Sequence, residues 1–184
     1  MSKVSNNWYV ITGGPSSGKT SLIDELNKLG HRTIPEAARI VIDEAIKKGI
    51  SVEELRADEK KFQDEVMRLK GEIEDSYDKN VLTFFDRGIH DTLAYFRFYG
   101  YEIDSWIKDL MDGARYQQVF LLEPLNTFKK DYARTEDHNF AKQLHKLLHD
   151  AYTEFEMEPT HVPAMSLDDR LKFILDKVKV GQTA

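Results

Sequence analysis

Residues 13–20 read Gly13-Gly14-Pro15-Ser16-Ser17-Gly18-Lys19-Thr20, a complete G-x-x-x-x-G-K-[ST] phosphate loop. A short apolar run at 8–11 precedes this motif and a helical pattern follows it, so the local context also fits. Glycines let backbone N–H groups turn inward around an anion, and the following helix adds partial positive charge at its amino terminus. We therefore predict that residues 13–20, together with Ser21, bind the phosphates of a nucleoside triphosphate.

Two side chains at the end of the loop have specific predicted roles. Lys19 is expected to reach the β- and γ-phosphates, and the Thr20 hydroxyl is expected to ligate Mg²⁺. The predicted cofactors are thus ATP and Mg²⁺. The alternative is a chance match on a glycine-rich turn, which the flanking strand and helix patterns disfavour.

The composition is typical of a globular protein. With 184 residues, 41% of them hydrophobic and 32% charged, the chain suits one α/β domain over 1–184 with a substantial core. The absence of cysteine excludes disulfides and fits a reducing, cytoplasmic setting. A net charge of −6 argues against a broad nucleic-acid surface. The sequence also lacks an apolar stretch long enough to span a membrane, and its start lacks the apolar core of a signal peptide.

Short apolar runs alternate with longer amphipathic stretches, which predicts β-α units around a parallel sheet. Strands are expected near 8–12, 31–34, 81–85, 118–122 and 161–162. Helices are expected near 19–29, 36–48, 51–77, 88–99, 103–113, 137–156 and 167–179. Ser51 with Glu54 three positions later has the pattern of a capping box at the start of the longest helix.

Asp86 and Arg87 follow the clearest buried strand. In a phosphate-loop protein, a carboxylate at this end of a parallel strand faces the Mg²⁺, so Asp86 is a predicted metal ligand and catalytic residue. An ordinary turn residue is the alternative. ATP-hydrolysing motors commonly place a glutamate at the next position, whereas Arg87 is suited to binding an anionic or polar substrate. The pair therefore favours group transfer over activation of water.

Glu36 and Arg39 open the helix that follows the second strand, and their spacing places them on one helical face. We interpret Glu36 as a hydrogen-bond acceptor or general base for an acceptor hydroxyl, and Arg39 as a substrate clamp. The alternative is a carboxylate favoured by the helix dipole and a surface ion pair. Tyr95, within an aromatic cluster at 95–101, is a predicted wall of the substrate pocket, although core packing also explains such a cluster.

Two other segments contain chemically interesting side chains. The polar stretch 124–137 is a predicted lid, in which Arg134, one helical turn after Lys130, brings positive charge to the transferring phosphoryl group. A solvated loop is the alternative.

His145 and His149 have a spacing able to bind a metal, but they lack the His-Glu-x-x-His pattern, so a solvated helix face is the favoured interpretation.

Taken together, these motifs resemble the NadR-type AAA-domain family of phosphate-loop NTPases over nearly the whole chain. The residues concerned are 13–20, Glu36 with Arg39, 85–95, 115–122, 131–136 and 162–163. The resemblance implies a three-layer, kinase-like α/β fold, in which a five-stranded parallel sheet has helices on both faces and the Asp86 strand lies beside the phosphate-loop strand. Asp86-Arg87 departs from the nicotinamide riboside kinases of that family and looks like the pair of thymidylate and deoxynucleoside kinases.

The favoured hypothesis is a Mg²⁺- and ATP-dependent phosphotransferase that acts on a small nucleoside-, nucleotide- or metabolite-like acceptor, without a nucleic-acid or membrane partner. The main alternative is a nucleotide-dependent switch or binding module for a protein partner. A GTPase switch is disfavoured, because the sequence lacks the Asn-Lys-x-Asp motif that recognises guanine. The only Asn-Lys pair, at 27–28, continues into Leu29-Gly30. An AAA-like assembly motor is a third reading, which Arg87 in place of glutamate disfavours.

Overall fold

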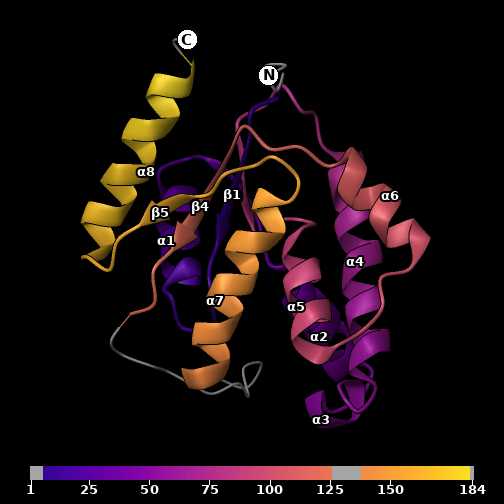
Figure 1. Ribbon diagram of the computed structural model, residues 1–184. Helices are drawn as coiled ribbons and strands as arrows, with labels where there is room; N and C mark the ends of the chain where they lie inside the picture. Colours follow the sequence, from indigo (N-terminus) through magenta and orange to yellow (C-terminus); the bar gives the residue numbers. More distant parts are fainter. Residues whose placement is uncertain (1–5, 126–137, 183–184) are drawn as a thin grey trace.

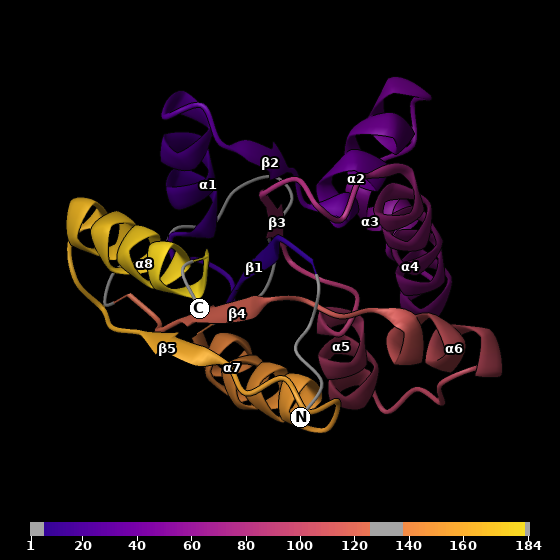
Figure 2. The same cartoon turned by 90° about the horizontal axis from the view of Figure 1, so that it is seen from above.

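The computed structural model describes residues 6–125 and 138–182. Within these ranges, five strands form one parallel sheet in the order β2-β3-β1-β4-β5. Figure 1 shows β1, β4 and β5 of this sheet, and Figure 2 shows all five strands. The strands are β1 (Trp8–Thr12), β2 (Arg32–Ile34), β3 (Thr83–Asp86), β4 (Gln118–Leu122) and β5 (Thr160–Val162). The phosphate-loop strand β1 is central, and β3, which ends at Asp86, lies beside it, as the family resemblance implies.

The described helices cover both faces of this sheet (Figure 2). They are α1 (Lys19–Lys28), α2 (Ala37–Lys47), α3 (Val52–Leu55), α4 (Glu59–Ser76), α5 (Asp91–Tyr99), α6 (Ser105–Gly113), α7 (His138–Thr153) and α8 (Leu167–Gln182). Helices α1 and α8 share a core with Tyr9 and Ile11, while α5 and α7 share the opposite core with Trp8 and Val10. Successive strand residues point to opposite faces, so β1 is buried along its whole length between two helical layers.

The predicted boundaries agree with the structure to within a few residues, with one exception. A single helix over 51–77 is wrong, because the chain forms α3 and α4 with a turn between them. Ser51 caps α3 as predicted, accepting a hydrogen bond from the backbone N–H of Glu54 at 3.1 Å. Asp58 then accepts from the backbone N–H of Lys61 at 3.1 Å and so caps a second helix. Two caps seven residues apart start two helices in place of one.

Among the described residues, no helix has both the length and the hydropathy needed to cross a bilayer.

Candidate nucleotide and acceptor site

The loop between β1 and α1 needs glycine where no side chain fits. Gly13 has a φ of 149°, and a Cβ there would lie 2.8 Å from Ser17 Oγ and 2.9 Å from the carbonyl oxygen of Leu122 at the end of β4. A Cβ at Gly14 would lie 2.9 Å from the carbonyl oxygen of Ala141 in α7. The loop backbone is therefore packed directly against β4 and α7, which fixes its shape.

Lys19 is buried against this loop. Its Nζ donates hydrogen bonds to the carbonyl oxygens of Gly13 and Gly14, each at 2.9 Å. Thr20 and Ser21 follow in the first turn of α1 and are exposed. An ammonium beside the backbone N–H groups of a helix amino terminus is the donor set that a polyphosphate needs. These residues therefore fit the predicted phosphate ligand.

Asp86 lies at the carboxyl end of β3, is buried, and is in register with Ile11 of β1. Since β1 and β3 are neighbours, the strand order brings this carboxylate to the edge of the sheet where the phosphate loop begins. A carboxylate and a hydroxyl are oxygen ligands of the kind that Mg²⁺ prefers. Asp86 and Thr20 thus have suitable chemistry for the predicted metal, and their roles stay predictions.

Arg87 links three parts of the site. Its φ of 71° is uncommon for a residue with a side chain, and its guanidinium is buried. Nε donates to Glu36 Oε1 at 2.6 Å, while Nη1 donates to Asp91 Oδ2 and to the carbonyl oxygen of Gly13, both at 3.1 Å. The start of α2, the end of β3 and the phosphate loop are therefore held together through one side chain.

A buried polar layer lies behind Arg87. Asp91 accepts hydrogen bonds from the Thr12 hydroxyl at 2.8 Å and from the Tyr152 hydroxyl. The same Tyr152 oxygen accepts from the backbone N–H of Gly88 at 3.2 Å. A Cβ at Gly88 would lie only 2.7 Å from that oxygen, so this close approach requires glycine. The layer fixes Asp91 and, through it, the Arg87 guanidinium.

Helix α4 contributes two buried charged groups that sequence reasoning missed. Lys70 Nζ donates to the carbonyl oxygen of Gly88 at 2.7 Å, and burial lowers the pKa of Lys70 to about 8. Glu74 accepts a hydrogen bond from the Tyr116 hydroxyl, and burial raises the pKa of Glu74 to about 7. Residue spacing could have indicated that Lys70 is buried, because Lys70 lies four residues after the buried Val66 and so shares its helix face.

A pocket opens beside the phosphate loop, lined by residues of α2, α4 and α5 and by Pro15 of the loop. Its volume, including space open to solvent, is about 630 Å³. Ile42, Phe62 and Val66 form an apolar part of the lining. The polar lining consists of Glu36, Arg39, Arg56, Gln63, Lys70, Arg87 and Tyr95. All four residues predicted to bind substrate, namely Glu36, Arg39, Arg87 and Tyr95, therefore line one pocket.

Most of the predicted lid at 124–137 lies in the part of the site that the structure does not describe. Residues 126–137 lie outside the described ranges, and Arg134 and Lys130 are among them. The catalytic role assigned to Arg134 stays a prediction.

Comparison with known proteins agrees with this architecture. A family model described as an AAA domain matches residues 8–170. No curated protein sequence matches the chain. Among solved structures, a NadR protein in complex with NAD and AMP-PNP has a TM-score of 0.66 at 14% identity, over 97% of this chain and 50% of that one. The chain thus spans half the length of that NadR protein.

Two kinases are similar over nearly their full lengths. Deoxyadenosine kinase from M. mycoides, solved with dCMP and dCDP, has a TM-score of 0.62 at 13% identity, covering 94% of this chain and 98% of that one. Thymidylate kinase from Ehrlichia chaffeensis has a TM-score of 0.59 at 16% identity, covering 93% and 97%. These likenesses confirm the predicted fold, a parallel sheet of five strands with helices on both faces.

Proposed function

The chain belongs to this AAA-domain family, and from that premise we propose that it is a Mg²⁺-dependent phosphotransferase. In this proposal the protein binds ATP at residues 13–21 and transfers the γ-phosphoryl group to a small acceptor. The acceptor is a nucleoside, a nucleotide or a related metabolite that occupies the pocket beside the phosphate loop.

The observation that supports transfer most strongly is the pocket itself. A transferase must hold an acceptor next to the phosphates, because proximity and orientation supply much of its rate acceleration. A hydrolytic switch needs room only for water. The pocket shares Pro15 with the phosphate loop, and Arg87 both lines it and donates to the loop carbonyl of Gly13.

The lining indicates the class of acceptor. Four cationic side chains and one carboxylate, Glu36, line the pocket together with apolar and aromatic groups. A ring that packs on Phe62 and Tyr95, with an anionic or multiply hydrogen-bonding group facing the guanidinium of Arg39, matches this mixture. The proposal therefore favours an acceptor that carries both an aromatic ring and polar or anionic groups.

The proposed catalytic roles follow from position. Lys19 and the loop amides hold the phosphates. Glu36, oriented by its ion pair with Arg87 at 2.6 Å, accepts a hydrogen bond from the attacking hydroxyl, and Asp86 is the alternative for this task. Thr20 and Asp86 would hold Mg²⁺, which when bound neutralises charge on the β- and γ-phosphates.

Incubation of the protein with γ-labelled ATP, Mg²⁺ and separate pools of nucleosides, nucleoside monophosphates and small metabolites tests the proposal. We expect label to move to an acceptor in one pool, and Lys19→Ala to weaken ATP binding by a factor of about 100 or more. Lys28→Ala, an exposed lysine of the same helix, is the matched control and retains binding.

Release of label only as inorganic phosphate, across all the pools, would contradict transfer and support the switch. If both lysine variants bind ATP as tightly as the unmodified protein does, the proposed role of Lys19 in the nucleotide site is wrong. These two outcomes are separate, because binding is measured calorimetrically without any acceptor.

A further inference from the structure

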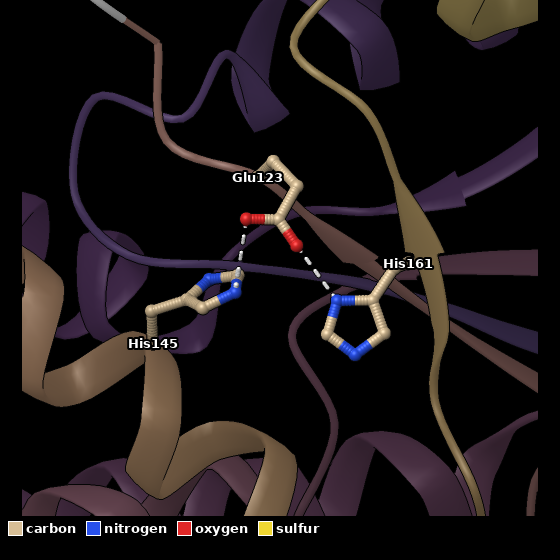
Figure 3. A group of neighbouring side chains, drawn as sticks. All are labelled: Glu123, His145 and His161. Carbon is tan, nitrogen blue, oxygen red and sulfur yellow. Dashed lines mark hydrogen bonds and ion pairs between the residues drawn. The ribbon is translucent and has the colours of Figure 1, made fainter.

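A second polar cluster lies outside the acceptor pocket. Figure 3 shows Glu123, His145 and His161 facing one another from the end of β4, from α7 and from β5. Glu123 Oε2 lies 3.3 Å from His145 Nε2, and Glu123 Oε1 lies 2.7 Å from His161 Nδ1. The expectation that His145 lies on a solvated face is wrong, because its side chain is only 16% exposed. Tertiary packing turns this helix position toward β4.

The backbone positions of the three residues are fixed by regular structure. Helix α7 is anchored in the core by Leu144 and Leu148, which are fully buried. The strand β5 pairs with β4, and the backbone N–H of Glu123 donates to the carbonyl oxygen of Val162 at 2.9 Å. Side chains presented from rigid elements hold a constellation more precisely than side chains on loops.

We propose that Glu123, His145 and His161 bind a divalent transition-metal ion, for which Zn²⁺ is the probe. One ligand atom from each residue lies within 4.8 Å of the other two. Tetrahedral Zn²⁺ has ligand bonds of about 2.0–2.2 Å, which places its ligand atoms ~3.4 Å apart. The 2.7 Å contact between Glu123 and His161 would therefore lengthen and the wider separations would shorten as the three side chains close on the ion. Two imidazole nitrogens and one carboxylate oxygen suit Zn²⁺ and its neighbours better than Mg²⁺.

The geometry leaves room for both adjustment and a fourth ligand. His145 Nδ1 is buried and has no hydrogen-bond partner in the part of the chain that the structure describes, so turning this ring toward a metal breaks no second bond. The side chains of Glu123 and His161 are 36% and 47% exposed, which leaves a coordination position for water. The competing interpretation is that no metal binds and that the Glu123 carboxylate only accepts one hydrogen bond from each histidine ring.

The chain provides three discriminating controls. His149, one turn further along α7, has its nitrogens 3.4 Å from Asp150 and 3.3 Å from Glu158 and is not one of the three ligands. His31 packs its ring against Phe84, away from the cluster, so His31→Gln removes a histidine without touching the site. Asp86→Asn reports any binding of the probe at the proposed Mg²⁺ position.

The test is a titration of tag-free, chelator-treated protein with Zn²⁺ in competition with a chromophoric chelator, in the absence of nucleotide. We expect one equivalent to bind, and Glu123→Gln, His145→Ala and His161→Gln each to weaken binding tenfold or more. His31→Gln and Asp86→Asn are expected to bind as the unmodified protein does. His149→Gln is expected to lose less than threefold.

Thermal unfolding with and without Zn²⁺ gives a second readout, since a ligand that binds only the folded state raises the Tm. The rise should occur in the unmodified protein and in His31→Gln, and should be absent in Glu123→Gln, which keeps the hydrogen-bond acceptor but loses the anion. The proposal is overturned if no stoichiometric Zn²⁺ binding occurs, or if the cluster variants bind Zn²⁺ as tightly as His31→Gln does. A preserved Tm rise in Glu123→Gln also overturns it.

Discussion

Removing the Tyr152 hydroxyl tests whether the buried polar layer stabilises the proposed site. This hydroxyl donates to Asp91 Oδ1 and accepts from the backbone N–H of Gly88 at 3.2 Å, and Tyr152 is fully buried. A hydrogen bond to a charged group contributes about 1.5–3 kcal/mol, and a neutral one about 0.5–1.5 kcal/mol. Phenylalanine removes only the oxygen atom and leaves the ring packing in place. We therefore expect Tyr152→Phe to lower the free energy of unfolding by about 2–4 kcal/mol.

The measurement is urea unfolding followed by far-UV circular dichroism, with thermal unfolding in parallel. For a chain of this size, a loss of about 2–4 kcal/mol corresponds to a Tm lowered by roughly 5–15 °C. Tyr77→Phe is the matched control, because the half-buried Tyr77 makes its contact with the Arg32 guanidinium through the ring, at 5.7 Å from the ring centre. The control should change the free energy of unfolding by less than about 0.5 kcal/mol. A Tyr152→Phe effect as small as that of the control would refute the reasoning.

Three further predictions follow from the same contacts. In denaturant unfolding, Gly88→Ala should lower the free energy of unfolding by about 1–3 kcal/mol, because its Cβ would lie 2.7 Å from the Tyr152 oxygen. Gly113→Ala is the control and should be neutral or stabilising, because nothing lies within 4 Å of its Cβ; equal effects of the two substitutions would contradict this account. Because burial raises the pKa of Glu74 from 4.5 to about 7, this carboxyl group stays protonated in the folded state after it has ionised in the unfolded state, and its contribution to stability falls as the pH rises through this window. The difference in the free energy of unfolding between the unmodified protein and Glu74→Gln isolates this contribution, because the buried His90, whose pKa burial lowers to about 4, titrates in both proteins and acts in the opposite sense. From pH 5 to pH 8 the unmodified protein should lose about 1–3 kcal/mol relative to Glu74→Gln and nothing relative to Glu72→Gln, an exposed neighbour; a difference from Glu74→Gln that does not change with pH would disprove it. Arg39→Met should raise the KM for the acceptor about tenfold or more while the Kd for ATP stays unchanged, and a loss of ATP affinity instead would place Arg39 in the nucleotide site.

The amino-acid sequence alone determined the phosphate loop and most of the secondary structure. The loop could be predicted because its requirements are local: glycines for backbone conformation, a lysine at a helix start and a hydroxyl beside it, all within eight consecutive residues. The strand before it could be predicted because a strand covered on both faces is a continuous apolar run. The one division that was missed, between α3 and α4, depended on Asp58 capping a second helix so soon after Ser51.

Tertiary structure alone decided which side chains meet. Arg87 contacts Glu36, 51 positions away, because β2 and β3 lie side by side, and Tyr152 reaches Asp91, 61 positions away, because α5 packs on α7. Lys70 lies on a helix face that the packing against α5 buries, so this lysine lines a pocket. Strand order and helix packing set such long-range distances, and neither is encoded in the spacing of residues along a single element.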